Sequence, residues 1–92
     1  ADIARVLKLE GKSDSELTNS LINKIREFNV ALNIPATMKE YGITEVDFLA
    51  NVKHIAHNAV LDACTGSNPR TIDDETMEKL LSCTFYGSEV KL

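Results

Sequence analysis

The chain has 92 residues, of which ten are Lys or Arg and 14 are Asp or Glu, so its formal net charge at pH 7 is −4. This length supplies one domain at most and is small for an enzyme with its own cofactor-binding fold. The scattered basic residues argue against nucleic-acid binding, and the lack of a bilayer-length apolar run or a signal peptide argues against a membrane partner and predicts a cytoplasmic location.

The first predicted helix runs from Asp2 to about Leu9 and ends before Gly11, a residue suited to a left-handed cap. Its apolar face carries Ile3, Val6 and Leu7. The chain starts with Ala1 rather than Met, and the apolar pattern is already running there. We therefore expect that the sequence begins inside a helix of a longer chain.

The second predicted helix begins after Ser13 and runs toward Pro35. Ser13 and Glu16 have the spacing of a capping box, in which each residue satisfies a backbone N–H of the other. A helical stripe of apolar residues follows, namely Leu17, Leu21, Ile25, Phe28 and Leu32. This stripe predicts one face packed against other helices.

Two further helical segments are expected next. Residues 36–41 have room for one or two turns, which Gly42 ends. Thr44 and Asp47 form a second capping box and open a helix from about Glu45 to Ala63. Small and apolar residues repeat along it at intervals of three and four: Leu49, Val52, Ala56, Ala59 and Ala63.

Residues 62–70 are expected to stop this helix and turn the chain. Gly66 can take the positive φ that closes a helix. Four other residues are assigned to the structure of the turn: Asp62, Asn68, Pro69 and Arg70. Pro69 biases the preceding residue toward an extended conformation, Asn68 can bond nearby backbone groups, and Arg70 can pair with Asp62 across the turn.

The last predicted helix opens with a third capping box, Thr71 with Asp74, and ends before Gly87. Its apolar face carries Met77, Leu80, Leu81 and Phe85, and the acids near its start suit the helix dipole without a catalytic explanation. No strand alternation or repeat is present. The sequence therefore predicts an all-α helical bundle of about four to five helices, in a single domain over residues 1–92.

Little in the chain favours an independent catalytic site. His54 and His57 lie three residues apart and could share a metal ion, but no third ligand stands at a matching offset, so we expect ordinary surface histidines and no metal site. Cys64 and Cys83 are expected to be reduced thiols. The four glycines are too far apart for a phosphate-binding loop, so no cofactor-binding or catalytic residue is assigned.

Several segments, in order, carry a resemblance to a known family. They are residues 2–5 (DIAR), 32–35 (LNIP), 41–43 (YGI), 48–52 (FLANV), 64–70 (CTGSNPR) and 85–87 (FYG). Together they resemble the C-terminal end of the iron-containing alcohol dehydrogenases, and are most similar to the alcohol dehydrogenase half of bifunctional aldehyde-alcohol dehydrogenases. The fold would then be a fragment of the family's C-terminal all-helical domain.

This resemblance implies a parent enzyme that reversibly reduces an aldehyde to a primary alcohol with NADH or NADPH at an iron(II) site. In the family, a Rossmann-like domain binds the nicotinamide, and one aspartate and three histidines bind the metal. All of these would lie before Ala1. We therefore expect the isolated chain to hold no cofactor, to be inactive alone, and to have the rest of the parent chain as its partner.

The resemblance also assigns roles within the turn. Cys64 matches a position that lines the substrate end of the catalytic cleft, and Thr65 and Gly66 match the adjoining turn, so these three residues are assigned to the pocket wall. Asn68, Pro69 and Arg70 match residues that brace it. Cys64 is not expected to act as a nucleophile, because aldehyde reduction needs no covalent intermediate. The alternative is that Cys64 is a buried cysteine without functional consequence.

A second class of function stays open at this point, namely a free-standing helical module that binds a partner helix or a neighbouring subunit. The two hypotheses predict different surfaces. A fragment should expose a large apolar face and could form a homo-oligomer through it, whereas a module should cover its apolar faces and present one groove. Because bifunctional enzymes of this type assemble into filaments, Phe85, Tyr86 and Gly87 are a further candidate contact with a neighbour.

Overall fold

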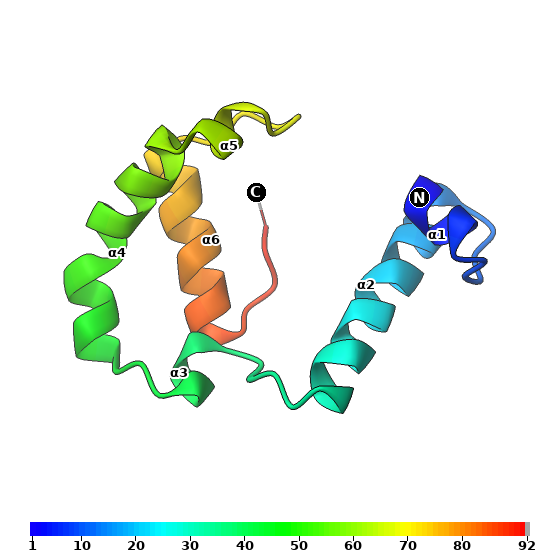
Figure 1. The fold of residues 1–92 in the computed structure, drawn as a ribbon, viewed down its shortest axis with the longest axis horizontal. Coiled ribbons are helices and arrows are strands. Elements are labelled where there is room, and N and C mark those ends of the chain that lie inside the picture. The colour runs from blue at the N-terminus through cyan, green and yellow to red at the C-terminus, as the bar shows by residue number, and fades with distance from the viewer. Residues whose placement is uncertain (92) are drawn as a thin grey trace. The chain divides into compact units, whose positions relative to one another are not determined.

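The computed structural model describes residues 1–91, which form six helices and no strand (Figure 1). The helices are α1 (Asp2–Val6), α2 (Asp14–Ala31), α3 (Met38–Tyr41), α4 (Glu45–Leu61), α5 (Ala63–Gly66) and α6 (Asp74–Tyr86). This confirms the all-α class. None of these helices is long and apolar enough to span a membrane within the described part of the chain.

The chain divides into two compact units, one of residues 1–35 with α1 and α2, and one from Ala36 onwards with α3 to α6. The prediction of a single domain over residues 1–92 stays a prediction. We describe each unit by itself.

In the first unit, α1 packs on α2 through a very small core. Ala4 is fully buried and Leu17 is 6% exposed. Arg5 links the two helices, because its guanidinium donates to Asp2 of α1 and to Asp14 of α2. Helix α1 therefore depends on one alanine contact and one exposed ion-pair network.

The prediction that Gly11 caps the first helix in a left-handed conformation is wrong. The helix ends at Val6, and Lys8 takes the positive φ, 54°, while Gly11 is not among the positive-φ residues. Gly11 serves a different purpose, because a Cβ placed there would lie 2.8 Å from the backbone N of Leu17. A side chain at this position would collide with the start of α2.

Helix α2 begins as predicted, since the Ser13 side chain accepts from the backbone N–H of Glu16 at 3.2 Å. The apolar stripe that follows is mostly exposed to solvent. Beyond Leu17, the exposed fractions are 52% for Ile25, 57% for Phe28 and 68% for Leu32. The sequence pattern identified an apolar face that the residues of the first unit do not cover.

The second unit is built on the packing of α4 against α6. The ring of Phe48 on α4 stacks on the ring of Phe85 on α6, with centroids 4.4 Å apart and an angle of 12° between the planes. Val52 completes the buried cluster, and Met38 and Leu81 pack against it. Figure 1 shows α4 and α6 side by side, with α5 at the end where α4 leads toward α6.

This core corrects one sequence prediction. The buried face of α4 carries Phe48, Val52 and Ala56, whereas Leu49 of the predicted stripe is 59% exposed. Of the three residues in the filament hypothesis, Phe85 is fully buried and Tyr86 is 47% exposed, so a contact with a neighbour through this end of the chain stays a prediction. Tyr86 is also engaged, because its hydroxyl donates to Glu45 Oε1 at 2.5 Å.

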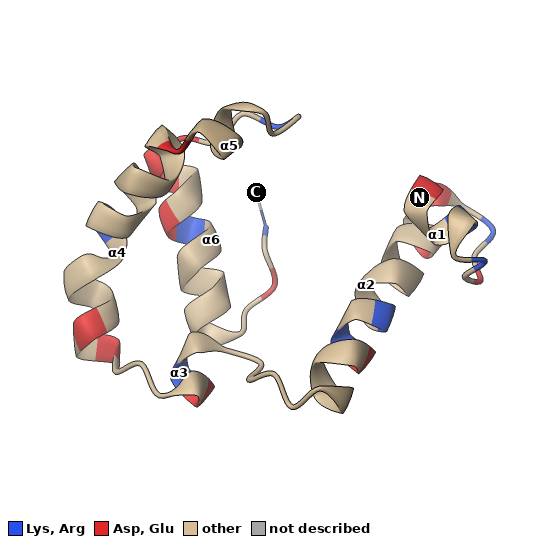
Figure 2. Cartoon of the chain, in the orientation of Figure 1, with Lys and Arg blue, Asp and Glu red and all other residues tan. Residues whose placement is uncertain are grey.

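In the second unit, helix α4 begins where the sequence predicted, after Thr44. The backbone N–H of Asp47 donates to Thr44 Oγ1 at 3.2 Å, and the Thr44 hydroxyl donates to Asp47 Oδ2 at 2.8 Å. A further cap that the sequence analysis missed opens α3, where Thr37 Oγ1 accepts from Glu40 N at 3.0 Å. Figure 2 shows the acidic residues that gather at the start of α4 and of α6.

The capping box predicted for the last helix, Thr71 with Asp74, is wrong. The N-cap is Asp73, whose carboxylate accepts from Thr76 N at 2.8 Å, and α6 begins at Asp74. Aspartate is a stronger N-cap residue than threonine, and in this register the Asp74 carboxylate also lies 2.8 Å from His57 Nδ1 on α4. The helix ends as predicted at Gly87, which takes a φ of 76°.

We expect Phe85→Ala to destabilise the second unit by about 3–5 kcal/mol, the usual cost of deleting a buried aromatic ring. Urea unfolding followed by circular dichroism measures this. Tyr41→Ala is the matched control, because Tyr41 is 75% exposed and should tolerate the change. Equal losses in both variants would contradict the assignment of Phe85 to the core.

The start of α6 should respond to pH. Hydrogen bonding from Thr76, through its side chain and its backbone N–H, lowers the pKa of the Asp73 carboxyl below its ordinary value of 3.8. A carboxyl with a lowered folded-state pKa stabilises the fold above its unfolded pKa, and this stabilisation is lost as the pH falls through the folded pKa. We expect the free energy of unfolding to decrease as the pH falls below 3.8.

Asp73→Asn is the test of this pH dependence, because Asn keeps the N-cap acceptor but does not titrate. Urea unfolding over a series of pH values should show a weaker acid dependence for this variant than for the unchanged chain. Superimposable pH profiles for the two proteins would rule out Asp73 as a contributor.

Candidate functional site

The candidate site is the turn of residues 62–70 between α4 and α6. Helix α4 ends at Leu61 rather than at the predicted Ala63. The reason is Asp62, which has extended backbone angles (φ −63°, ψ 134°) and accepts a hydrogen bond from Cys64 N at Oδ1, at 2.8 Å. Asp62 therefore closes α4 and caps the single turn of α5.

Gly66 does not close the preceding helix, contrary to the prediction. It lies in α5 without a positive φ, and an added Cβ would meet no atom within 4 Å. Nothing in this chain's own structure requires glycine there. Asp62 performs the closing role that the sequence analysis assigned to Gly66.

The turn is braced by hydrogen bonds from its own side chains. Asn68 Oδ1 accepts from Arg70 N at 2.9 Å, which confirms the predicted role of Asn68. Ser67 donates from its hydroxyl to the backbone O of Cys64 at 2.8 Å. The predicted ion pair of Arg70 with Asp62 is absent from residues 1–91, where the Asp62 carboxylate instead accepts from the Cys64 backbone N–H.

The three residues assigned to the pocket wall, Cys64, Thr65 and Gly66, differ in their exposure to solvent. Cys64 is exposed in this chain, so the pocket-wall assignment and the alternative of a cysteine buried in the complete enzyme both stay predictions. Gly66 is exposed as well, whereas Thr65 is half-buried and donates its hydroxyl to the backbone O of Ala59 at 2.6 Å. The turn therefore offers the Cys64 thiol outward while Thr65 faces the end of α4.

The two histidines are engaged separately. His57 Nδ1 lies 2.8 Å from Asp74 Oδ2, and His54 Nε2 lies 3.1 Å from Asn58 Nδ2. Within residues 1–91, no three His, Cys, Asp or Glu side chains are grouped closely enough to hold a metal ion. The described residues of this chain therefore do not fit an iron ion.

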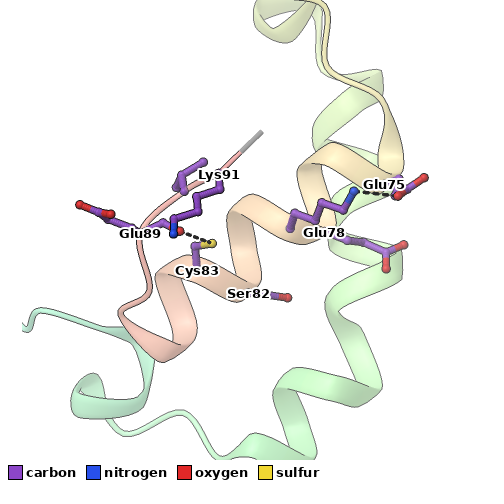
Figure 3. Close-up of a pocket in the computed structure, with 8 residues that line it drawn as sticks. Glu75, Glu78, Ser82, Cys83, Glu89 and Lys91 are labelled. Atoms are coloured by element: carbon purple, nitrogen blue, oxygen red, sulfur yellow. Dashed lines mark hydrogen bonds and ion pairs between the residues drawn. The ribbon is translucent and has the colours of Figure 1, made fainter. Parts of the chain in front are cut away.

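Several hollows lie away from the turn, and two of them adjoin α6. One, of about 420 Å³, lies between α6 and the segment after it, where Cys83 Sγ is 3.7 Å from the backbone O of Glu89 (Figure 3). Its charged lining residues are Glu75, Glu78, Lys79, Glu89 and Lys91. The other is an apolar groove of about 220 Å³ over α3, α4 and α6, beside Phe48. The sequence analysis missed both, because each depends on segments that only the tertiary structure brings together.

The family model described as "Fe-containing alcohol dehydrogenase family, C-terminal" matches residues 1–85. The chain belongs to the iron-containing alcohol dehydrogenase family. The match covers every segment that carried the resemblance except the end of the FYG segment, so the resemblance is confirmed at the level of the family.

Curated relatives agree with this membership. The chain is 47% identical over 90 residues to the NADPH-dependent butanol dehydrogenase of Clostridium saccharobutylicum. The aligned region is 98% of this chain and 23% of that protein. It is 42% identical over 84 residues to an aldehyde-alcohol dehydrogenase of Clostridium acetobutylicum, covering 90% of this chain and 10% of that protein. It is 34% identical over 91 residues to the bifunctional aldehyde-alcohol dehydrogenase of Escherichia coli, and the aligned region is 97% of this chain and 10% of that protein.

The chain thus spans between a tenth and a quarter of the length of these relatives. Membership of a family of alcohol dehydrogenases favours the dehydrogenase hypothesis over a free-standing interaction module. The exposed apolar stripe of α2 agrees with this preference, since a module was expected to cover its apolar faces.

We expect Cys64 to react with iodoacetamide faster than Cys83. Cys64 is exposed, whereas Cys83 is half-buried and its thiol lies against the backbone O of Glu89. Mass spectrometry of the two cysteine peptides at timed intervals measures both rates in one sample, so each thiol serves as the control for the other. Faster modification of Cys83 would contradict the described placement of the turn.

Proposed function

We propose that this chain is a C-terminal helical part of an iron-containing alcohol dehydrogenase that reversibly reduces an aldehyde to a primary alcohol with NADH or NADPH. The observation that carries the proposal is the family match over residues 1–85. The chain would contribute one wall of the substrate cleft, be inactive alone, and work in the cytoplasm.

The turn of residues 62–70 would supply that wall, with Cys64, Thr65 and Gly66 at the substrate end of the cleft. Its geometry supports this role in two ways. Cys64 is exposed, and its thiol enters no hydrogen bond within residues 1–91, so the thiol is free to pack against an alkyl chain. The side-chain hydrogen bonds within the turn hold its shape without a ligand.

Cys64 would shape the pocket and not attack the substrate. A nucleophilic thiol needs a base or a cation that lowers its pKa, and the nearby imidazole of His57 is paired with Asp74. Uncharged and moderately small, the cysteine side chain suits contact with the apolar part of a short aldehyde.

Iron(II) and the nicotinamide would be bound by other parts of the complete enzyme, since the described residues do not fit a metal ion. We therefore assign no metal or cofactor ligand in this chain. Because the first-named relative is an NADPH-dependent butanol dehydrogenase, NADPH and butanal are the first cofactor and substrate to assay.

The remaining enzyme would also cover the apolar stripe of α2. Ile25, Phe28 and Leu32 are each more than half exposed, and burying them is favourable by about 25 cal/mol per Å² of apolar surface. The rest of the parent chain is the partner that we propose for this face. A homo-oligomer of the isolated chain through the same face is the alternative.

The test is an assay of the complete enzyme that contains this chain, expressed from its full reading frame and supplied with iron(II). We expect butanal-dependent oxidation of NADPH or NADH by the complete enzyme and none by the 92-residue chain. An enzyme that is folded and metal-loaded yet shows no aldehyde reduction with either cofactor would overturn the proposal.

A variant tests the pocket wall separately. Cys64→Leu should lower kcat/KM for butanal by at least roughly tenfold, because it adds more than the one methylene that already costs about tenfold in an apolar pocket, with a smaller effect on acetaldehyde. Cys83→Leu is the matched control, since Cys83 lies on α6 outside the turn. Equal effects of the Cys64 change on both aldehydes would argue against a place beside the alkyl chain.

A further inference from the structure

One side chain of the turn bonds to helix α4. Thr65 Oγ1 donates to the backbone O of Ala59 at 2.6 Å. Ala59 lies in the last turn of α4, where backbone carbonyls lack the amide that a continuing helix would supply. The backbone N of Asp62 also reaches this oxygen, but at 3.4 Å, which is long for a hydrogen bond. The Thr65 hydroxyl is therefore the better partner of this carbonyl.

The other side-chain hydrogen bonds of the turn stay within it. The backbone N–H of Cys64 donates to Asp62 Oδ1, and its backbone O accepts from the Ser67 hydroxyl, both at 2.8 Å. These bonds make the Cys64 backbone move together with the turn. Consequently, the bond from Thr65 to Ala59 determines how the turn, and Cys64 with it, sits on α4.

A second contact joins the two helices on either side of the turn of residues 62–70. His57 Nδ1 and Asp74 Oδ2, 2.8 Å apart, join α4 to the first turn of α6, and the turn of residues 62–70 lies between them in the chain. This pair limits where the two ends of the segment lie. It leaves the orientation of the turn itself to Thr65.

We propose that Thr65 is a positioning residue, whose hydroxyl holds the turn on α4 and thereby sets where the Cys64 thiol lies. This deepens the assignment of Thr65 to the pocket wall, because a hydroxyl proton donated to Ala59 is not available as a donor to a substrate. The catalytic consequence rests on the proposed function, whereas the effect on the position of the thiol does not.

The experiment compares Thr65→Val and Thr65→Ser in the complete enzyme that contains this chain. Two quantities are measured: the rate of Cys64 alkylation by iodoacetamide, from mass spectrometry of its peptide, and kcat and KM for butanal. Val keeps the shape of threonine but cannot donate, whereas Ser keeps the donor.

We expect Thr65→Val to change the rate of Cys64 alkylation roughly fivefold, because loss of the hydrogen bond to α4 lets the turn, and the exposed thiol that it carries, shift its position. We expect its kcat/KM to fall by about ten- to a hundredfold, the range that a misplaced contact can cost. Thr65→Ser should restore both values to near those of the unchanged enzyme. A Thr65→Ala variant replaces Thr65→Val if the latter does not fold.

Thr84→Val is the matched control. Its hydroxyl also donates to a helix carbonyl, the backbone O of Leu80 at 2.9 Å, but it lies on α6 outside the turn. The same chemical change there should leave Cys64 alkylation and kcat/KM as they are in the unchanged enzyme.

The proposal is overturned if Thr65→Val leaves Cys64 alkylation unchanged, or if Thr65→Ser is impaired as much as Thr65→Val. The second result would assign the effect to packing of the threonine methyl group. If the unchanged enzyme reduces no aldehyde, the proposed function fails, and the alkylation rates alone then decide the role of Thr65.

Discussion

The stacked rings of Phe48 and Phe85 are the contact on which the second unit depends. One ring lies near the start of α4 and the other near the end of α6, so the stack sets these helices side by side in opposite directions. The far ends of the two helices are then close enough for His57 to reach Asp74. The chain between them has to turn within a short distance, which is where the candidate site lies.

Several polar groups of that turn are satisfied by local hydrogen bonds. Asp62 performs two tasks, since its backbone ends α4 and its carboxylate caps α5. Thr65 supplies the donor that the end of α4 lacks. With these groups engaged, the Cys64 thiol remains exposed on a braced support.

The two units differ in how well their own residues cover their apolar surface. The second unit buries an aromatic cluster, whereas the first buries little besides Ala4 and Leu17. A stripe as apolar as that of α2 is unusual on the surface of a free monomer when several of its members are exposed together. This accords with a chain that matches the C-terminal region of a larger enzyme family.

The sequence by itself determined the helical class, the caps at Ser13 and Thr44, and the family, because capping, periodicity and motif order are local properties of the chain. The tertiary structure decided what depends on distant partners. Only packing against α6 selects Phe48 over Leu49 as the buried residue of α4. Only the position of α6 beside α4 brings Asp74 within reach of His57, and only the end of α4 gives the Thr65 hydroxyl its acceptor. Local patterns leave these contacts open, because the partner of each residue comes from another element of the fold.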